Sequence, residues 1–439
     1  MFRDRRSIVS AMVAATAVVG LAAQSTPRTD AFVESMDHPA VAYTTGPVHN
    51  AAADLNDQIR RGALKLPFDP ASGYLRPVLD ALRIPIDSQT LVFSRGSMQA
   101  QQITPANPRA VYFNDTVAVA WVRGAEVLEV AAHDARQGVV FYTLEQKAAS
   151  SPRLERDNRC LECHLTWDTL GVPGFQVLST FQMSDDPNAY ASGLVSDHRT
   201  PLQDRWGGWY VTGQAGTTQH RGNVPVVVPA SELQRPRRAA PQLSSVSGRF
   251  DTHGFPSEHS DVVALMVLEH QSRMANLLTR VGWEMRVAMP PAPALSRQPL
   301  VSTALPARVL DAINDLVDYL LFVDETPLST RVSGSSGFAQ RFSAMGPKDS
   351  RGRSLRQLDL TRRLFRYPCS YMIDTPAFDG LMPEAKQAIY QRLWTILSGA
   401  ERDPRYDRLS ASDRQAIVEI LRDTKHDLPP SFAGPITPR

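Results

Sequence analysis

The sequence has few cysteines for its length and no excess of charge. Its 439 residues include 3 cysteines, which excludes a fold held together by a network of disulfides. Lysine and arginine (47) nearly balance aspartate and glutamate (45), so the net charge of +2 gives no reason to expect nucleic-acid binding. After residue 23 no apolar run is long enough to cross a bilayer, so we expect no transmembrane span in the mature chain.

The first 23 residues have the composition of a secretory signal peptide. Arg3, Arg5 and Arg6 precede an apolar run from Ile8 to Ala23, and small residues follow. A run of about 16 residues is short for a bilayer span of about 20, which favours cleavage over membrane anchoring. The sequence therefore predicts a periplasmic or otherwise exported protein.

Two kinds of pattern divide the rest of the chain. Runs rich in Val, Phe, Tyr and Trp predict strands over 110–113, 117–122, 127–132 and 139–145, with two more within 175–183 and 206–214. Apolar residues at helical spacing predict helices over 259–285, 307–323, 383–399 and 410–424. We therefore predict an α+β fold, with a β-rich half followed by a mainly helical half. The expected segments are a signal peptide (1–23), an irregular or helical segment (24–105), the β-rich region (106–228), a linker (229–256) and a helical domain (257–439).

Two of the three cysteines lie in the stretch RCLECHLTW, which begins at Arg159. Cys160, Cys163 and His164 would occur in this arrangement by chance about 5 times in 10,000 chains of this composition. A structural zinc site needs four ligands, usually as two spaced pairs, and no second pair is present because Cys369 stands alone. A redox dithiol would follow a strand at the start of a helix, whereas polar loop sequence precedes this motif. Covalent haem is the remaining interpretation.

This stretch resembles the haem attachment site of c-type cytochromes. The resemblance implies thioether bonds from Cys160 and Cys163 to one covalent haem c, and His164 as the proximal ligand of the haem iron. By the same resemblance, the carbonyl of Pro173 is expected to accept a hydrogen bond from the His164 ring. Two longer stretches, Ser196–Gly213 and Gly352–Ile373, are similar to segments of a cytochrome-like group of large exported bacterial proteins. That similarity implies no activity.

The sixth ligand of the iron would decide the chemistry, and several side chains are candidates. His270 lies on an apolar helix face between Met266 and Met274, either of which is an alternative ligand. His198 lies in a turn next to an aspartate that could orient its ring. His220 and Met183 are further candidates. Each of these residues could equally belong to the core or the surface.

Charged and aromatic residues near His198 suggest a haem environment. Arg199 and Arg205 could pair with the haem propionates, and Trp206 could pack on the macrocycle. A surface turn with ordinary salt bridges explains the same residues. The basic run from Lys348 to Arg366 could dock an acidic redox partner, although a solvated face is the commoner explanation.

Three functions remain compatible with the sequence. The first is an exported mono-haem c-type cytochrome that transfers electrons to a redox partner protein. The second is a haem enzyme of the peroxidase or oxygenase kind, with an open distal site near His198 and Arg199 or near His270. The third is a haem-bearing subunit of a redox complex whose partner carries out the chemistry.

Overall fold

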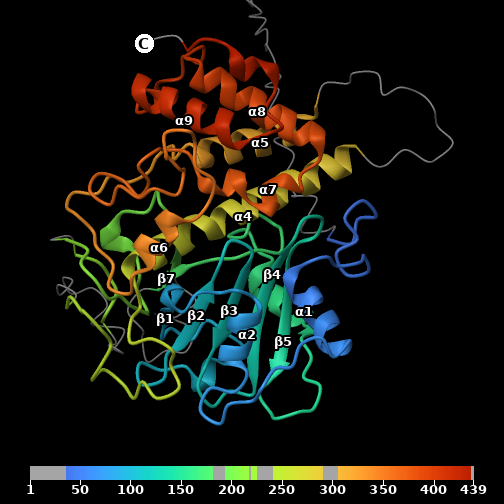
Figure 1. Cartoon of the computed structure of the whole chain (residues 1–439), viewed down its shortest axis with the longest axis vertical. Coiled ribbons are helices and arrows are strands. Elements are labelled where there is room, and N and C mark those ends of the chain that lie inside the picture. Colours follow the sequence, from blue (N-terminus) through green and yellow to red (C-terminus); the bar gives the residue numbers. More distant parts are fainter. Residues whose placement is uncertain (1–35, 181–192, 217–218, 225–240, 290–304, 437–439) are drawn as a thin grey trace, which may run out of the picture.

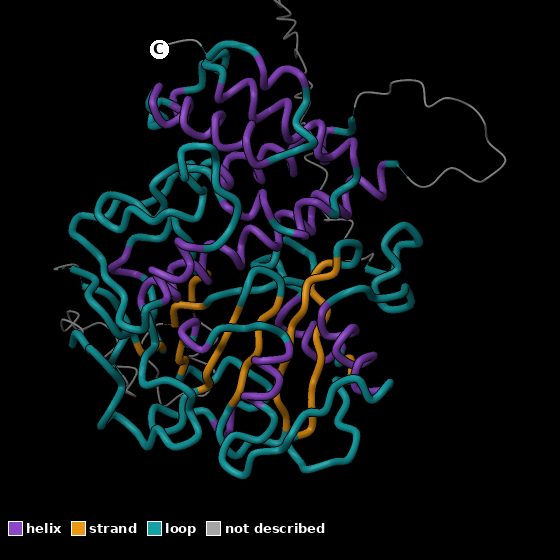
Figure 2. The backbone as a smooth tube through the Cα atoms, viewed as in Figure 1, coloured by secondary structure: helices purple, strands orange, loops and turns teal. Residues whose placement is uncertain are grey.

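The computed structural model describes residues 36–180, 193–216, 219–224, 241–289 and 305–436. The expected signal peptide and the candidate ligand Met183 lie outside these residues. The described part has the predicted α+β architecture, with an antiparallel sheet in the N-terminal half and mostly helices in the C-terminal half (Figure 1). Most helices gather at one end of the molecule, and the strands lie at the other end with a few short helices beside them (Figure 2).

The main sheet has seven strands in the order β6-β5-β4-β3-β2-β1-β9, and every neighbouring pair is antiparallel. Its strands are β1 (Thr90–Val92), β2 (Arg109–Phe113), β3 (Val117–Trp121), β4 (Val127–Asp134), β5 (Gly138–Glu145), β6 (Glu155–Arg156) and β9 (Trp209–Tyr210). A separate pair consists of β7 (Leu178–Thr180) and β8 (Gly193–Val195). The four strands predicted within 110–145 are β2 to β5, and the runs 175–183 and 206–214 contain β7 and β9.

The two faces of the sheet have different partners because side chains alternate along each strand. One face carries large residues such as Tyr112, Val119 and Tyr142, which pack in one core with Leu55 of α1 (Ala51–Arg60) and Leu79 of α2 (Leu75–Ala81). Figure 1 shows both helices in front of the strands. The other face lines a cavity together with the segment that follows the cysteine motif.

Helix α4 (Val262–Ala288) lies between the sheet and the helices of the C-terminal half (Figure 1). It begins after Asp261, whose side chain accepts hydrogen bonds from the N–H groups of Val263 and Ala264. Most of its residues are buried on every side of the helix. Among the described residues, no helix combines the length and the apolar character that a bilayer span requires.

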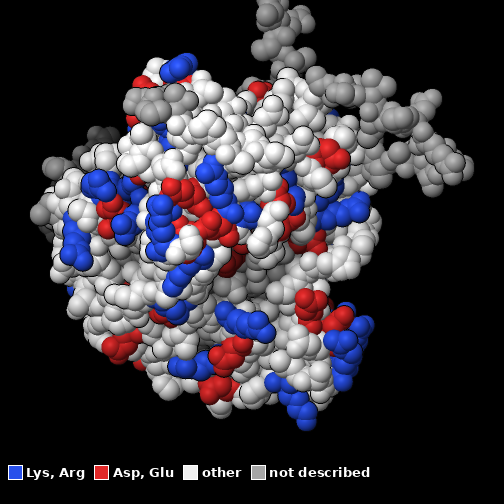
Figure 3. All heavy atoms as spheres, turned by 45° about the horizontal axis from the view of Figure 1, so that its top comes forward, with Lys and Arg blue, Asp and Glu red and all other residues white. Residues whose placement is uncertain are grey.

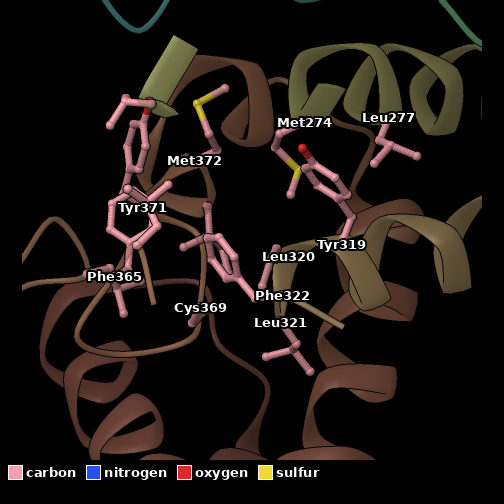
Figure 4. Packing of buried hydrophobic residues seen from close by; sticks show 14 of the residues in the cluster. Met274, Leu277, Tyr319, Leu320, Leu321, Phe322, Phe365, Cys369, Tyr371 and Met372 are labelled. Atoms are coloured by element: carbon pink, nitrogen blue, oxygen red, sulfur yellow. The ribbon is translucent and has the colours of Figure 1, made fainter. Parts of the chain in front are cut away.

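The remaining helices pack against α4 and one another. They are α5 (Ala307–Leu320), α6 (Phe338–Ala344), α7 (Pro376–Asp379), α8 (Pro383–Leu397) and α9 (Ala411–Thr424). The four helices predicted from periodicity are α4, α5, α8 and α9, whereas α6 was not predicted from the sequence. Cys369 is buried among aromatic and aliphatic side chains of this half (Figure 4), and burial raises the pKa of its thiol well above the usual value.

Candidate functional site

The cysteine motif folds as a single helical turn. A short 3₁₀ segment, Asn158–Cys160, leads into α3 (Leu161–His164), and the side chain of Asp157 accepts a hydrogen bond from the N–H of Arg159 at the start. Residues three apart on a helical turn lie on the same side of it. Cys160 is half-buried, Cys163 is exposed, and both line one large cavity.

This cavity has about 1350 Å³ of free space, part of it open to solvent. Its floor is the second face of the sheet, and three alanines lie in the middle of that floor: Ala118 and Ala120 on β3, and Ala131 on β4. Ala118 and Ala131 are cross-strand partners. Larger side chains at these positions would fill the space, so the run of alanines leaves room for a flat ligand above the sheet.

The walls of the cavity come from segments far apart in the sequence. The strand segment Phe175–Thr180 contributes one wall, with Trp209 of β9 beside it. Leu268 and Ser272 of α4 contribute another. Trp209 is held in place because its indole N–H donates to the carbonyl of Leu178 at 2.8 Å.

His164 is oriented by its backbone neighbours. Its Nδ1 lies 2.8 Å from the carbonyl oxygen of Gly174, which can only accept a hydrogen bond, so Nδ1 carries the proton and the lone pair is on Nε2. The ring packs on Phe141 with the centroids 4.8 Å apart. Burial lowers the pKa of His164, so the ring is neutral near pH 7, which is the form that binds metals.

The sequence predicted the carbonyl of Pro173 as the hydrogen-bond acceptor for His164. That prediction was wrong, because the carbonyl of Gly174 takes this place. The carbonyl of Pro173 instead accepts the N–H of Val139, which ties this segment to β5. The neighbouring carbonyl, one residue later, is the one that faces the imidazole.

Helix α4 fixes the segment that carries this carbonyl. The side chain of Asn276 accepts the N–H of Phe175 at 2.9 Å and donates to the Phe175 carbonyl at 2.7 Å, as a neighbouring strand would. A Cβ at Gly174 would lie 2.2 Å from Asn276 Oδ1, so only glycine fits there. Gly174 and Asn276 thus position His164. Neither residue was predicted from the sequence to belong to the site.

Charged groups line part of the cavity. Arg109 and Glu129 form an ion pair across the sheet, and Arg159 also lines the space while pairing with Asp157. Burial opposes ionisation of Glu129, but Arg109 and two side-chain hydrogen bonds outweigh it and hold its pKa below the usual value. Guanidinium groups in this position could bind the carboxylates of a ligand in the cavity.

His270 and His198 lie outside the cavity. His270 is two positions from both Leu268 and Ser272, which places it on another side of α4. Its Nδ1 lies 2.9 Å from Nδ1 of His198, and its Nε2 lies 2.7 Å from Ser370 Oγ. Both histidines are buried and stack on Tyr319.

The other predicted haem neighbours belong to the same buried region. Arg205 forms a buried ion pair with Glu269 at 3.1 Å. Trp206 is fully buried and packs edge-on against His220, with the ring centroids 5.2 Å apart. Arg199 pairs with Asp197 at 2.6 Å. None of these side chains lines the cavity, and Met266 and Met274 are core residues as well.

Acidification from pH 7 to pH 5 is expected to lower the free energy of unfolding by several kcal/mol. Burial lowers the pKa of His270 to about 3, those of His133 and His220 to about 4, and that of His198 well below its usual value. The unfolded chain therefore takes up protons below pH 6.5 that the folded chain does not, which costs about 2 kcal/mol per histidine. Burial also raises the pKa of Glu269 to about 7 despite Arg205. The folded state therefore takes up a proton at Glu269 on acidification, which raises the free energy of unfolding by about 2 kcal/mol and offsets part of the loss.

Urea denaturation at pH 5, 6 and 7 measures this dependence. In Glu269→Gln this offsetting contribution is absent, so the loss between pH 7 and pH 5 should be about 2 kcal/mol larger than in the wild type. An unfolding free energy that stays constant over this range would contradict the argument.

The basic run of the helical half is largely neutralised within the chain. Five of its arginines are ion-paired, namely Arg351, Arg353, Arg356, Arg362 and Arg363. Positive and negative side chains lie side by side over this end of the molecule (Figure 3). The described residues thus give little support to a basic docking surface there.

The donor set around the cavity fits one covalent haem better than it fits a bare metal ion. Two thiols on one turn and a neutral, oriented imidazole adjoin a space with an apolar floor and two guanidinium groups in its lining. Within the described ranges, no group of three or more His, Cys, Asp or Glu side chains is placed to hold a metal ion. Searches of protein-family models, curated proteins and solved structures found no match to this chain.

Proposed function

We propose that this chain is an exported mono-haem c-type cytochrome that transfers electrons. Cys160 and Cys163 would hold the haem through thioether bonds, and His164 would bind the iron through Nε2. The haem itself would supply the one-electron couple of its iron. The protein would orient the axial ligand, shield one face of the haem from water and leave part of its edge accessible.

One observation carries the proposal. The turn with both cysteines opens directly into the alanine-floored cavity, and His164 in the same turn is already oriented by the Gly174 carbonyl. A carbonyl that accepts a hydrogen bond from the other ring nitrogen fixes the tautomer and orientation of an iron-bound histidine. A zinc site or a redox dithiol would need neither a cavity of this size nor a fixed imidazole beside it.

Exposure at the motif favours electron transfer. Cys163 lies at the surface, and Trp167, three residues after His164, has 66% of its surface exposed. A haem bound here would have the edge near Cys163 close to solvent, where a redox partner protein can approach. Electron transfer needs such an approach because the partners never exchange atoms.

The peroxidase or oxygenase alternative loses its expected distal residues. General acid–base catalysis requires a side chain within hydrogen-bond reach of the reacting group. None of His198, Arg199 and His270 lines the cavity. The two histidines contact each other, and Arg199 pairs with Asp197. A haem-bearing subunit of a larger complex stays compatible with the same site, because it uses the haem in the same way.

Absorption spectra of the purified protein, produced together with a haem-maturation system, test the proposal. We expect haem absorbance to stay with the polypeptide after denaturation and solvent extraction, and the reduced spectrum to be unchanged by carbon monoxide. Loss of all haem on extraction would refute the covalent site. A reduced spectrum that shifts under carbon monoxide would favour the enzyme alternative, because it requires an open iron coordination position.

A further inference from the structure

The loop after β1 places a methionine at the same cavity. Met98 lies between Ser97 and Gln99, and 49% of its surface is exposed. Its side chain lines the cavity together with the cysteine motif. Nothing in the sequence around it distinguishes it from an ordinary surface residue.

The residues on both sides of Met98 are hydrogen-bonded through their side chains to the sheet. Ser97 Oγ donates to Glu129 Oε1 at 2.9 Å, and Gln99 Nε2 donates to the same oxygen at 3.0 Å. Glu129 is in turn held by Arg109. Met98 is therefore presented over β4 by two anchors that share one carboxylate.

The attachment points of Met98 and of His164 lie close together on the cavity floor. Glu129 and Ala131 are two residues apart on the same face of β4, and Ala131 is the cross-strand partner of Phe141, on which the His164 ring packs. From strand geometry, Glu129 and Phe141 are about 8 Å apart. A methionine and a histidine held from points this close can both reach one metal ion between them.

The residue types that line the cavity also favour Met98 as a ligand. Of the described residues that line the cavity, His164 is the one imidazole and Met98 the one thioether. The histidines considered from sequence lie outside it. Thioether sulfur and imidazole nitrogen together are a ligand pair that gives a low-spin iron suited to electron transfer.

We propose that Met98 is the sixth ligand of the haem iron, bound through its sulfur atom. This inference rests on the proposed function, since it needs a haem held by Cys160 and Cys163. It adds the residue that closes the iron to external ligands. Glu129, Ser97 and Gln99 are then positioning residues that hold the loop over the haem.

Spectra of Met98→Ala, of Met98→His and of Met345→Ala test the inference. Met345 is also an exposed methionine, but it lines a different cavity and serves as the matched control. In the oxidised wild type and in M345A we expect the weak long-wavelength band that arises from sulfur bound to ferric haem. M98A should lose this band and bind carbon monoxide when reduced. M98H should lose the band yet stay low-spin and indifferent to carbon monoxide, which a merely structural methionine would not produce.

Two negative results have different meanings. If the wild type carries no covalent haem, the proposed function fails and this inference fails with it. If covalent haem is present but M98A keeps the sulfur band, or the wild type lacks it, only the assignment of Met98 is overturned. Because Met98 is half-exposed, the substitutions should leave folding unchanged, and circular dichroism checks this.

Discussion

Replacing Cys160 and Cys163 together by alanine is expected to abolish covalent haem attachment completely. Each thiol would form one thioether bond, and a chain without either has no covalent link to the cofactor. The fold should persist, since Cys163 is exposed and Cys160 is half-buried. The measurement is haem absorbance that remains with the polypeptide after denaturation, compared with the wild type.

Single variants and the third cysteine make this prediction specific. Cys160→Ala and Cys163→Ala should each keep one link, so haem should still resist extraction, in lower yield. Cys369→Ala is the matched control, because Cys369 is buried in the helical half and away from the cavity. Haem that stays covalently bound in the double variant, or that disappears in C369A, would show that the site has been misplaced.

Replacing Ala118 and Ala131 together by leucine is expected to reduce haem incorporation at least about tenfold. Overpacking costs about 1–3 kcal/mol per substitution in a filled site, and about 1.4 kcal/mol corresponds to a factor of ten. The two alanines face each other across β3 and β4, so two leucines would occupy the centre of the floor. Both are only partly buried, so the apoprotein should lose little stability.

A residue on the same face of the sheet provides the control for this variant. Thr143 is the cross-strand partner of Glu129 but does not line the cavity. Thr143→Leu should therefore incorporate haem normally. Haem content per polypeptide and urea denaturation of the apoprotein measure the two effects. Normal haem content in the double leucine variant would mean that no ligand lies on the alanine floor.

Local sequence patterns predicted most of the fold. Alternating Val and aromatic residues marked β2 to β5, and the 3.6-residue period marked α4, α5, α8 and α9, because these elements have long enough runs for the pattern to be visible. Strand β1 was not predicted, since three residues have no period of their own. Its partners, β2 and β9, are both supplied by later parts of the chain.

The candidate site could be predicted only where its residues are adjacent in sequence. Cys160, Cys163 and His164 form one turn, so their spacing was informative. His270 was a candidate because it lies on an apolar helix, but α4 is buried on all sides, and periodicity cannot tell which buried side faces a cavity. Met98 is in a polar loop, and its position depends on a carboxylate of β4 that no local pattern connects with it.

The separation of α4 from the cysteine turn sets an order for maturation. Phe175 is anchored by Asn276, 101 positions further along the chain, while the turn from Asp157 to His164 is closed by contacts between near neighbours. In a chain that emerges N-terminus first, the cysteine turn can form before α4 has emerged. Under the proposed function, thioether formation would need only that turn, whereas fixing the imidazole and excluding water would need α4. The cofactor would then be attached to a partly folded chain, and α4 would pack against the bound cofactor afterwards.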